Sequence, residues 1–247
     1  MLHGKRIASI IGARAGSKGL PGKSLLDLGG RPVIAWTIEA ARGSRYLDRV
    51  VVSTDSPAIA AAARAAGADA PFLRPEELAN DTCSIEAVVA HALATLRRDG
   101  DLGRFDYVVL LHPTIPFRTP AQIDTCLERY FESSPTPVDT LVSVASAPDK
   151  IGWLLSSRDG RHVHFAFDVG TDLRRQALPS YYLPNGVFYV APADPFPGRF
   201  YADATRFVVL DDPDLVDLDT PDDLDRARAV LARRRRAPAP APDLVSP

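Results

Sequence analysis

Short apolar runs alternate with helical segments along most of the chain, and this alternation constrains the fold more than any other feature. The runs are "RIASIIG" at 6–12, "RVVVS" at 49–53, "YVVLL" at 107–111 and "TLVSVA" at 140–145. Strands that alternate with helices form a parallel sheet that is covered on both faces. The sequence therefore predicts a three-layer, Rossmann-like α/β fold with a mainly parallel sheet.

Local signals predict where the helices begin and end. A helix over "RPVIAWTIEAARG" has proline near its start and glycine after its end, and Ser56-Pro57 opens an Ala-rich helix that stops at Gly67. Thr82 or Ser84 caps the helix "IEAVVAHALATLRR". Thr119-Pro-Ala-Gln122 is a capping box that starts a helix to about Phe131.

The pattern changes after residue 146. The runs "KIGWLLSS", "HVHFAF" and "GVFYVA" predict antiparallel strands, and we interpret about 147–184 as a β-rich insertion that could pair with another subunit. The segment from 207 onward returns to strand, loop and helix. We predict a single domain at 1–232, followed by a charged, Pro/Ala-rich tail at 233–247 that is extended or disordered.

Composition excludes several classes of protein. A chain of 247 residues can bury a real core, and its net charge of -2 gives no sign of a nucleic-acid surface. No apolar run is long enough to span a bilayer, and the N-terminus does not resemble a signal peptide. The two cysteines, Cys83 and Cys126, have no metal spacing, which favours a reduced, cytoplasmic setting.

The loop "GARAGSKGLPGKS" at 12–24 ends like an ATPase phosphate loop but does not match one. The first glycine of that motif should be residue 17, which is Ser17, and Pro21 removes a backbone N–H donor. The expected helix is also postponed to Pro32. What remains is a glycine-rich loop with Arg14, Lys18 and Lys23, which suits a polyphosphate; a solvated turn is the alternative.

Six segments, in order, resemble the acylneuraminate cytidylyltransferase family, which includes the CMP-sialic acid and CMP-Kdo synthetases. They are "ARAGSKGLPGKSLLDLGGRPVIAWTIEAA", "RVVVSTDS", "PFLRPEELANDTCSIEAVVAHAL", "VVLLHPTIPFRT", "RRQALPSYYLPNGVFYV" and "VDLDTPDDLDRA". Together they cover nearly all of residues 5–230. The resemblance implies a nucleotidyltransferase fold, transfer of CMP from CTP to an acidic sugar with release of pyrophosphate, and a homodimer formed through the insertion.

The same resemblance implies roles for individual residues. Arg14 and Lys23 are expected to be catalytic and to hold the triphosphate with Mg²⁺, which Asp217 and Asp219 would bind. The expected nucleotide-binding residues are Ala13, Arg14, Gly16, Ser17, Lys18, Lys23, Arg74 and Ser84. The expected acceptor-binding residues are His112, Thr114, Arg118, Arg174, Gln176 and Asn185. The partners are therefore CTP and a small acidic acceptor, with no nucleic acid and no membrane.

Four positions depart from the family pattern and leave the acceptor open. His112 replaces a glutamine, Ile115-Pro-Phe117 replaces Ser-Pro-Leu, and Pro184 replaces an arginine. A 3-deoxy-ulosonic, sialic-acid-like sugar is the first interpretation. A small phosphonate or its carboxylate is the second, and a non-catalytic nucleotide-binding protein is the third.

Other polar residues have simpler interpretations. Asp55 could bind the nucleotide or cap the turn into the helix at 57, and capping is favoured. We expect Thr220 to cap the last helix beside the metal-binding Asp219. His162 and His164 lack an apparent third metal ligand, so a structural or surface role is favoured. His112 could contact the acceptor, act as a base or be structural.

Overall fold

A six-stranded sheet in the order β2-β1-β3-β7-β4-β8 forms the middle layer of the molecule. The computed structural model describes residues 2–16, 19–98, 100, 104–132, 136, 139–157, 162–167, 179–202 and 205–236. Five strands run parallel to one another: β1 (Ile7–Gly12), β2 (Arg49–Ser53), β3 (Tyr107–Leu110), β4 (Leu141–Ser146) and β8 (Arg206–Val209). β7 (Tyr182–Pro192) runs antiparallel between β3 and β4. The predicted mainly parallel α/β sheet is confirmed.

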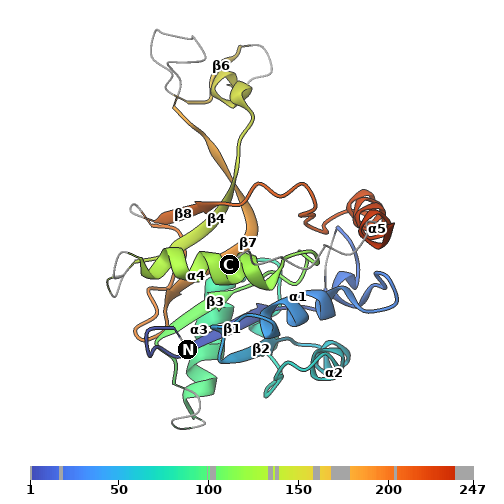
Figure 1. The fold of residues 1–247 in the computed structure, drawn as a ribbon, viewed down its shortest axis with the longest axis vertical. Helices are drawn as coiled ribbons and strands as arrows, with labels where there is room; N and C mark the ends of the chain where they lie inside the picture. The colour runs from blue at the N-terminus through green and yellow to red at the C-terminus, as the bar shows by residue number, and fades with distance from the viewer. Residues whose placement is uncertain are drawn as a thin grey trace, which may run out of the picture.

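Helices cover both faces of this sheet (Figure 1). One face packs on α1 (Val33–Arg42), α2 (Pro57–Ala65) and α4 (Pro120–Phe131). The other face packs on α3 (Ile85–Leu96) and the aromatic segment around Phe200. Side chains along β1 alternate between the two cores, with Ile7 and Ile11 in the first and Ala8 and Ile10 in the second.

The helix starts follow the predicted caps. Ser84 accepts a hydrogen bond from the Ala87 N–H at 3.2 Å and so caps α3. Thr119 and Gln122 form the capping box of α4, with the Gln122 N–H 3.2 Å from the Thr119 hydroxyl. Such a cap supplies acceptors to N–H groups that the first helical turn leaves unpaired.

The run "GVFYVA" forms part of an antiparallel strand, β7, as predicted; it lies outside the predicted insertion at about 147–184 and pairs with both β3 and β4 in the centre of the main sheet. The prediction of a strand over "KIGWLLSS" is wrong for most of its length, because residues Asp149–Trp153 form the 3-10 helix η4 and only β5 (Leu155–Ser156) is a strand. It pairs with the two-residue β6 (His164–Phe165).

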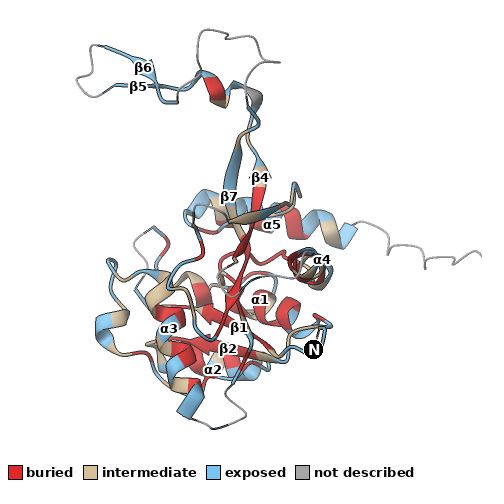
Figure 2. Ribbon diagram, turned by 90° about the vertical axis from the view of Figure 1, so that its left-hand side faces the viewer, coloured by how far each residue is buried: buried red, intermediate tan, exposed pale blue. Residues whose placement is uncertain are grey.

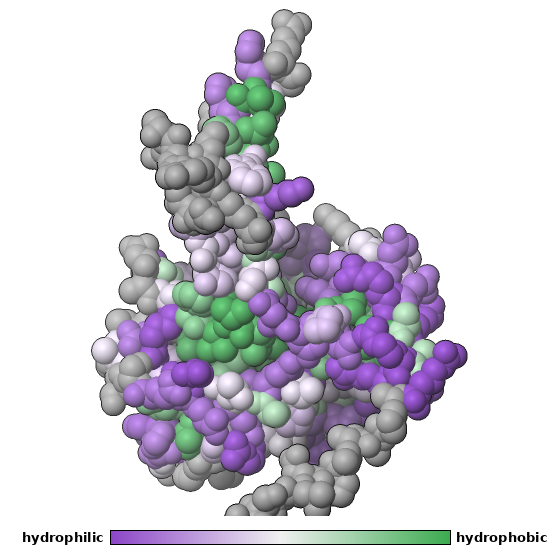
Figure 3. All heavy atoms as spheres, turned by 45° about the horizontal axis from the view of Figure 1, so that its top comes forward, coloured by the Kyte–Doolittle hydropathy of each residue, from purple (hydrophilic) through white to green (hydrophobic). Residues whose placement is uncertain are grey.

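The segment between β4 and β7 projects from the body as an arm (Figure 1). We call residues 147–181 the arm. Its described part is mostly exposed in Figure 2, and Leu154, Val163 and Phe165 are 49%, 62% and 41% exposed. Figure 3 shows this apolar surface in green on the upper part of the molecule.

The last helix, α5 (Pro221–Arg236), packs on a third apolar cluster with Leu28, Phe117 and Leu218. It continues past the predicted domain limit at residue 232, and the remainder of the predicted tail lies outside the described residues. The described residues of the body also include the short 3-10 helices η1 (Lys23–Leu25) and η2 (Glu76–Leu78). Among the described helices, none has the length and apolar character needed to cross a bilayer.

Candidate active site

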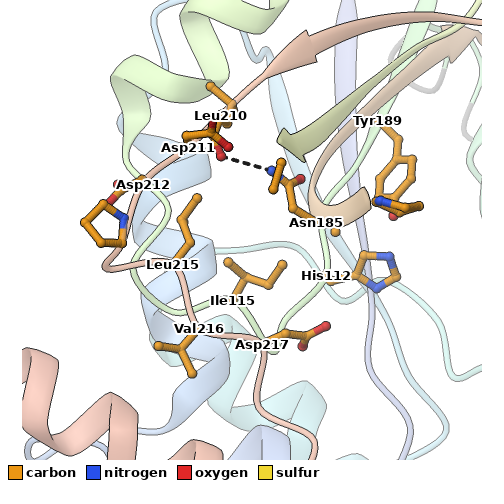
Figure 4. A pocket seen from close by; sticks show the side chains of 14 residues that line it. His112, Ile115, Asn185, Tyr189, Leu210, Asp211, Asp212, Leu215, Val216 and Asp217 are labelled. Carbon is orange, nitrogen blue, oxygen red and sulfur yellow. Dashed lines mark hydrogen bonds between the residues drawn. The ribbon is translucent and has the colours of Figure 1, made fainter. Parts of the chain in front are cut away.

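Two cavities meet at the carboxyl ends of β1 and β3. The smaller, about 370 Å³, is called the cationic cavity because Arg14, Lys23 and Arg74 line it. The larger, about 630 Å³, is called the large cavity and lies between β7 and the segment 210–217 (Figure 4). His112 lines both, so a molecule bound in one cavity can meet a molecule bound in the other. This is the edge at which parallel α/β sheets bind ligands.

Backbone hydrogen bonds fix the loop that follows β1. The Ala13 N–H donates to the Ser53 carbonyl at 3.0 Å, and the Ala15 N–H donates to the Asp55 carboxylate at 3.0 Å. The prediction that Asp55 caps α2 is wrong, because Ser56 supplies that cap by accepting from the Ile59 N–H. Asp55 instead anchors the loop that carries Arg14.

Two glycines give this loop its shape. Gly22 has a φ of 65°, a left-handed conformation that glycine adopts at little cost, and it turns the chain into η1 at Lys23. A methyl group on Gly19 would lie 2.5 Å from the Asp219 carbonyl oxygen. Lys23-Ser24 therefore opens a short 3-10 turn rather than an α-helix, as expected for a loop that is not an ATPase phosphate loop.

Arg14 and Lys23, the loop cations that the structure describes, pair with carboxylates from distant parts of the chain. Arg14 lies 2.5 Å from Asp81, and the Lys23 ammonium lies 2.6 Å from the Asp219 carboxylate. Arg14 is 31% and Lys23 21% exposed, so both remain accessible from the cavity. An incoming polyphosphate would find its counter-charges already oriented.

The buried guanidinium of Arg74 forms part of the wall of the cationic cavity. It donates to the Ser53 carbonyl and, at 3.3 Å, to the Leu78 carbonyl, while its Nε is buried without a partner. Burial lowers the pKa of Arg74, and Asp55 partly offsets this. The predicted Ser84 does not line the cavity in this structure, although its neighbours Cys83 and Ile85 do.

Asp217 and Asp219 lie at the junction of the two cavities, Asp217 lining the large one and Asp219 the cationic one. The Asp217 carboxylate is exposed at the cavity mouth, yet the surrounding protein displaces enough water to raise its pKa. A hydrogen bond with Thr114 opposes that shift, and the neighbouring Asp219 charge adds to it. Two adjacent carboxylates of this kind attract a cation.

Thr220 forms the predicted capping box beside this pair. The Asp223 N–H lies 3.3 Å from the Thr220 hydroxyl, and the Thr220 N–H donates to the Asp223 carboxylate at 2.9 Å. Because Thr220 and Asp223 cap the helix, the Asp219 carboxylate is not needed for capping and pairs with Lys23. Within the described part of the chain, no group of three or more His, Cys, Asp or Glu could hold a metal ion by itself.

His112 sits at the centre of the site with its ring against Tyr189, at 5.4 Å between centroids. Burial, with the nearby positive charges of Arg118 and Lys23, lowers its pKa to about 4, and Asp219 acts in the opposite direction. The imidazole is therefore neutral near pH 7. In this form it can donate one hydrogen bond and accept another.

Arg118, a predicted acceptor ligand, is 3% exposed and lines neither cavity. It donates to the Val187 carbonyl at 2.6 Å and to the His112 carbonyl at 3.2 Å. Arg118 therefore fixes the backbone beneath His112 instead of facing the cavity. Thr114 and Asn185 do reach the site: Thr114 lines the cationic cavity and Asn185 the large one.

Of the remaining predicted residues, Ala13 lines the cationic cavity, while Gly16 is exposed on the loop outside its lining. Ser17, Lys18, Arg174 and Gln176 lie outside the described residues. The structure adds Asp81 and Asn80, which the sequence analysis did not single out. Their only local signal is the polar run Asn80-Asp-Thr82 between η2 and α3.

Comparison of the sequence with known protein families identifies the family of this chain. The family model described as Cytidylyltransferase matches residues 8–151, which include the glycine-rich loop, Arg74 and His112. The chain belongs to the cytidylyltransferase family. It is a CTP-dependent nucleotidyltransferase enzyme, and the interpretation as a non-catalytic nucleotide-binding protein is set aside.

Several relatives resemble this cytidylyltransferase over most of its length. The CMP-N,N'-diacetyllegionaminic acid synthase of Legionella pneumophila is 37% identical over 222 residues, which is 88% of this chain and 93% of that protein. The 3-deoxy-manno-octulosonate cytidylyltransferase of Anaeromyxobacter is 32% identical over 92% of this chain and 98% of its own. The N-acylneuraminate cytidylyltransferase of Escherichia coli is 30% identical over 94% of this chain but only 53% of that protein.

A solved CMP:2-keto-3-deoxy-manno-octonic acid synthetase in complex with CTP has the same fold. Its TM-score is 0.69 at 19% identity, with 93% of this chain and 99% of that chain covered. This confirms the predicted nucleotidyltransferase fold with a mostly parallel sheet.

Proposed function

We propose that this cytidylyltransferase transfers CMP from CTP to an acidic 3-deoxy-ulosonic sugar of the sialic-acid type. The observation that carries the proposal is the meeting of the cationic cavity and the large cavity at His112, between Lys23 and the pair Asp217 and Asp219. One cavity has the cations for a triphosphate, and the other has room for a sugar. The relatives' names support an acidic sugar as acceptor.

In the proposed reaction, the anomeric hydroxyl oxygen of the acceptor forms a bond to the α-phosphorus of CTP. The bond from that phosphorus to the bridging oxygen breaks, and pyrophosphate leaves with the electron pair; the hydroxyl proton passes to solvent. Arg14 and Lys23 would stabilise the charge that develops on the phosphate oxygens. Neutral His112 would orient the attacking hydroxyl as a hydrogen-bond partner.

Mg²⁺ is the proposed cofactor, and the residues present fit it. Asp217 and Asp219 offer hard carboxylate oxygens beside the cationic cavity, and Mg²⁺ is usually bound through one or two carboxylates together with phosphate oxygens. When bound, the ion would neutralise phosphate charge. The Asp219 carboxylate would then bind the metal ion instead of the Lys23 ammonium, and the ammonium would be available to the triphosphate.

We also propose that the enzyme is a homodimer paired through the arm. The described part of the arm exposes Leu154, Leu155, Val163 and Phe165, and its two-stranded ladder is only two residues long on each side. An isolated ladder of this size gains little stability in water, so burial against a second copy would stabilise it. A cytoplasmic location remains a prediction of the sequence.

Pyrophosphate release tests the proposed reaction. Purified enzyme with Mg²⁺ would be given CTP, UTP or ATP together with N-acetylneuraminate, 3-deoxy-manno-octulosonate or a small phosphonate, and the products identified by mass spectrometry. We expect release with CTP and a ulosonic acid, and a product carrying CMP. Release with the phosphonate alone would contradict the acceptor assignment, and release with no acceptor would contradict the reaction.

A further inference from the structure

Two parts of the wall of the cationic cavity touch each other at Gly19. This glycine belongs to the glycine-rich loop, and it meets the backbone of Asp219 in residues 216–220, here called the aspartate segment. A Cβ atom on Gly19 would lie 2.5 Å from the Asp219 carbonyl oxygen and 3.6 Å from the carbonyl carbon. Nonbonded heavy atoms favour separations of about 3.5 Å or more. A side chain at this position would therefore have to move the two backbones roughly 1 Å apart.

Gly19 is needed for this close approach and not for an unusual backbone conformation. Its φ angle lies outside the left-handed region, whereas Gly22 in the same loop has a φ of 65°. An alanine at position 19 would therefore meet no left-handed strain. It would instead meet the Asp219 carbonyl, a backbone group that cannot move aside as the end of a flexible side chain can.

The aspartate segment is held in place on its side of the contact. Leu218 is fully buried, and its N–H donates to the Thr114 carbonyl at 3.0 Å. The Asp219 N–H donates to the carboxylate of Asp223, in the first turn of α5, at 3.2 Å. A displacement of the segment away from Gly19 works against both hydrogen bonds and against the packing of Leu218.

The glycine-rich loop is held in place on the other side. Leu20, directly after Gly19, is 8% exposed and lies in the same apolar cluster as Leu218. Its carbonyl accepts from the Lys23 N–H at 3.2 Å, so the turn that carries the Lys23 side chain begins beside the contact. The Lys23 ammonium in turn lies 2.6 Å from the Asp219 carboxylate. Backbone contact, apolar packing and an ion pair therefore join the loop to the aspartate segment.

On the basis of the proposed function, we infer that Gly19 is a positioning residue, which sets the distance between Lys23 and Asp219 before CTP binds. Because Gly19 has no side chain, the loop that supplies cations to the triphosphate and the segment that supplies carboxylates form one framework. Preorganised groups lose activity steeply when they are displaced, and a shift of about 1 Å can lower a rate about 100-fold. A bound Mg²⁺ also requires near-ideal octahedral geometry, so its carboxylate ligands tolerate little displacement.

The test compares Gly19→Ala with the wild-type enzyme in two assays. With CTP, Mg²⁺ and the ulosonic acid that the wild-type enzyme turns over, we expect kcat for pyrophosphate release to fall about 100-fold. The second assay contains no acceptor and measures Mn²⁺ binding to the complex of enzyme and CTP by electron paramagnetic resonance, against a blank with CTP alone. We expect the Kd for Mn²⁺ to rise about 10-fold, because Asp219 is displaced from the other groups of the site.

Gly198→Ala is the matched control for a general loss of stability. Gly198 has a φ of 74°, is exposed, has open space where a Cβ atom would lie and lines neither cavity. Alanine there strains a remote loop without touching the site. It should leave kcat and the Kd for Mn²⁺ at their wild-type values, and equal losses in Gly198→Ala and Gly19→Ala would overturn the inference.

The two assays separate failure of the inference from failure of the proposed function. Wild-type kcat and Mn²⁺ affinity in a folded Gly19→Ala enzyme would overturn the inference and leave the proposed reaction intact. Absence of Mn²⁺ binding to wild-type enzyme with CTP would refute the proposed metal site and the inference together. If Gly19→Ala does not fold, Leu20→Ala decides, since it weakens the packing between loop and segment without a clash. Weaker Mn²⁺ binding by Leu20→Ala supports the inference, and unchanged binding overturns it.

Discussion

Replacing His112 with glutamine is expected to remove a specific part of the acid sensitivity of the fold. The folded protein lowers the pKa of His112 from its ordinary value of 6.5 to about 4, chiefly through burial. Between these two values the unfolded chain binds a proton that the folded chain does not. Stability therefore falls as pH drops through 6.5 and stops falling below about 4.

The size of the effect follows from the shift. The difference between 6.5 and about 4 corresponds to about 3 kcal/mol of unfolding free energy at low pH. At pH 5 the unfolded imidazole is almost fully protonated and the folded one is mostly neutral, so about 2 kcal/mol is already lost. Above pH 7.5 both states are neutral at this side chain, and its contribution vanishes.

Urea unfolding at pH 7.5 and pH 5 measures this directly. The wild-type protein should lose about 2 kcal/mol more than His112→Gln between these two pH values, because the carboxylates that titrate are common to both proteins. His112→Asn, also neutral, should behave like the glutamine variant. A wild-type pH dependence equal to that of both variants would refute the reasoning, whatever the variants do to activity.

Three further predictions concern the site and the fold. Lys23→Ala should lower kcat/KM for CTP by about 100-fold or more without changing the circular dichroism spectrum, since the loop ammonium neutralises phosphate; normal pyrophosphate release would contradict its role. Asp219→Asn should raise the Mg²⁺ concentration needed for half-maximal activity, and an unaltered Mg²⁺ titration would mean that this carboxylate serves only to hold Lys23. Thr119→Ala should lower the unfolding free energy by about 1 kcal/mol, because the Gln122 N–H loses its acceptor; a urea midpoint equal to wild type would show that the cap is redundant.

Local signals in the sequence predicted the elements well because their causes are local. The capping box at Thr119 and the cap at Ser84 depend on side chains within three residues, so spacing alone reveals them. These features would be recognised in any chain with the same short segments.

Contacts between residues that lie far apart in the sequence could not be predicted from such local signals. The run in β7 indicates a strand, but its place between β3 and β4 is set by packing across the whole sheet. Asp55 has a typical capping position, yet its carboxylate accepts from the Ala15 N–H. Arg118 occupies a motif of the site, and only the fold shows that backbone carbonyls surround it.

The arm leaves and rejoins the sheet at positions that face each other, since Ser146 at the end of β4 is in register with Tyr182 at the start of β7. The pairing of β4 with β7 holds the two ends of the arm together. A change in the length of the arm therefore alters the stability of the body only through loop-closure entropy, by about 0.6 kcal/mol for each doubling of its length. The arm can therefore be replaced during evolution without disturbing the residues of the active site. An arm taken from a relative and joined at Ser146 and Tyr182 would meet strand ends that are already paired.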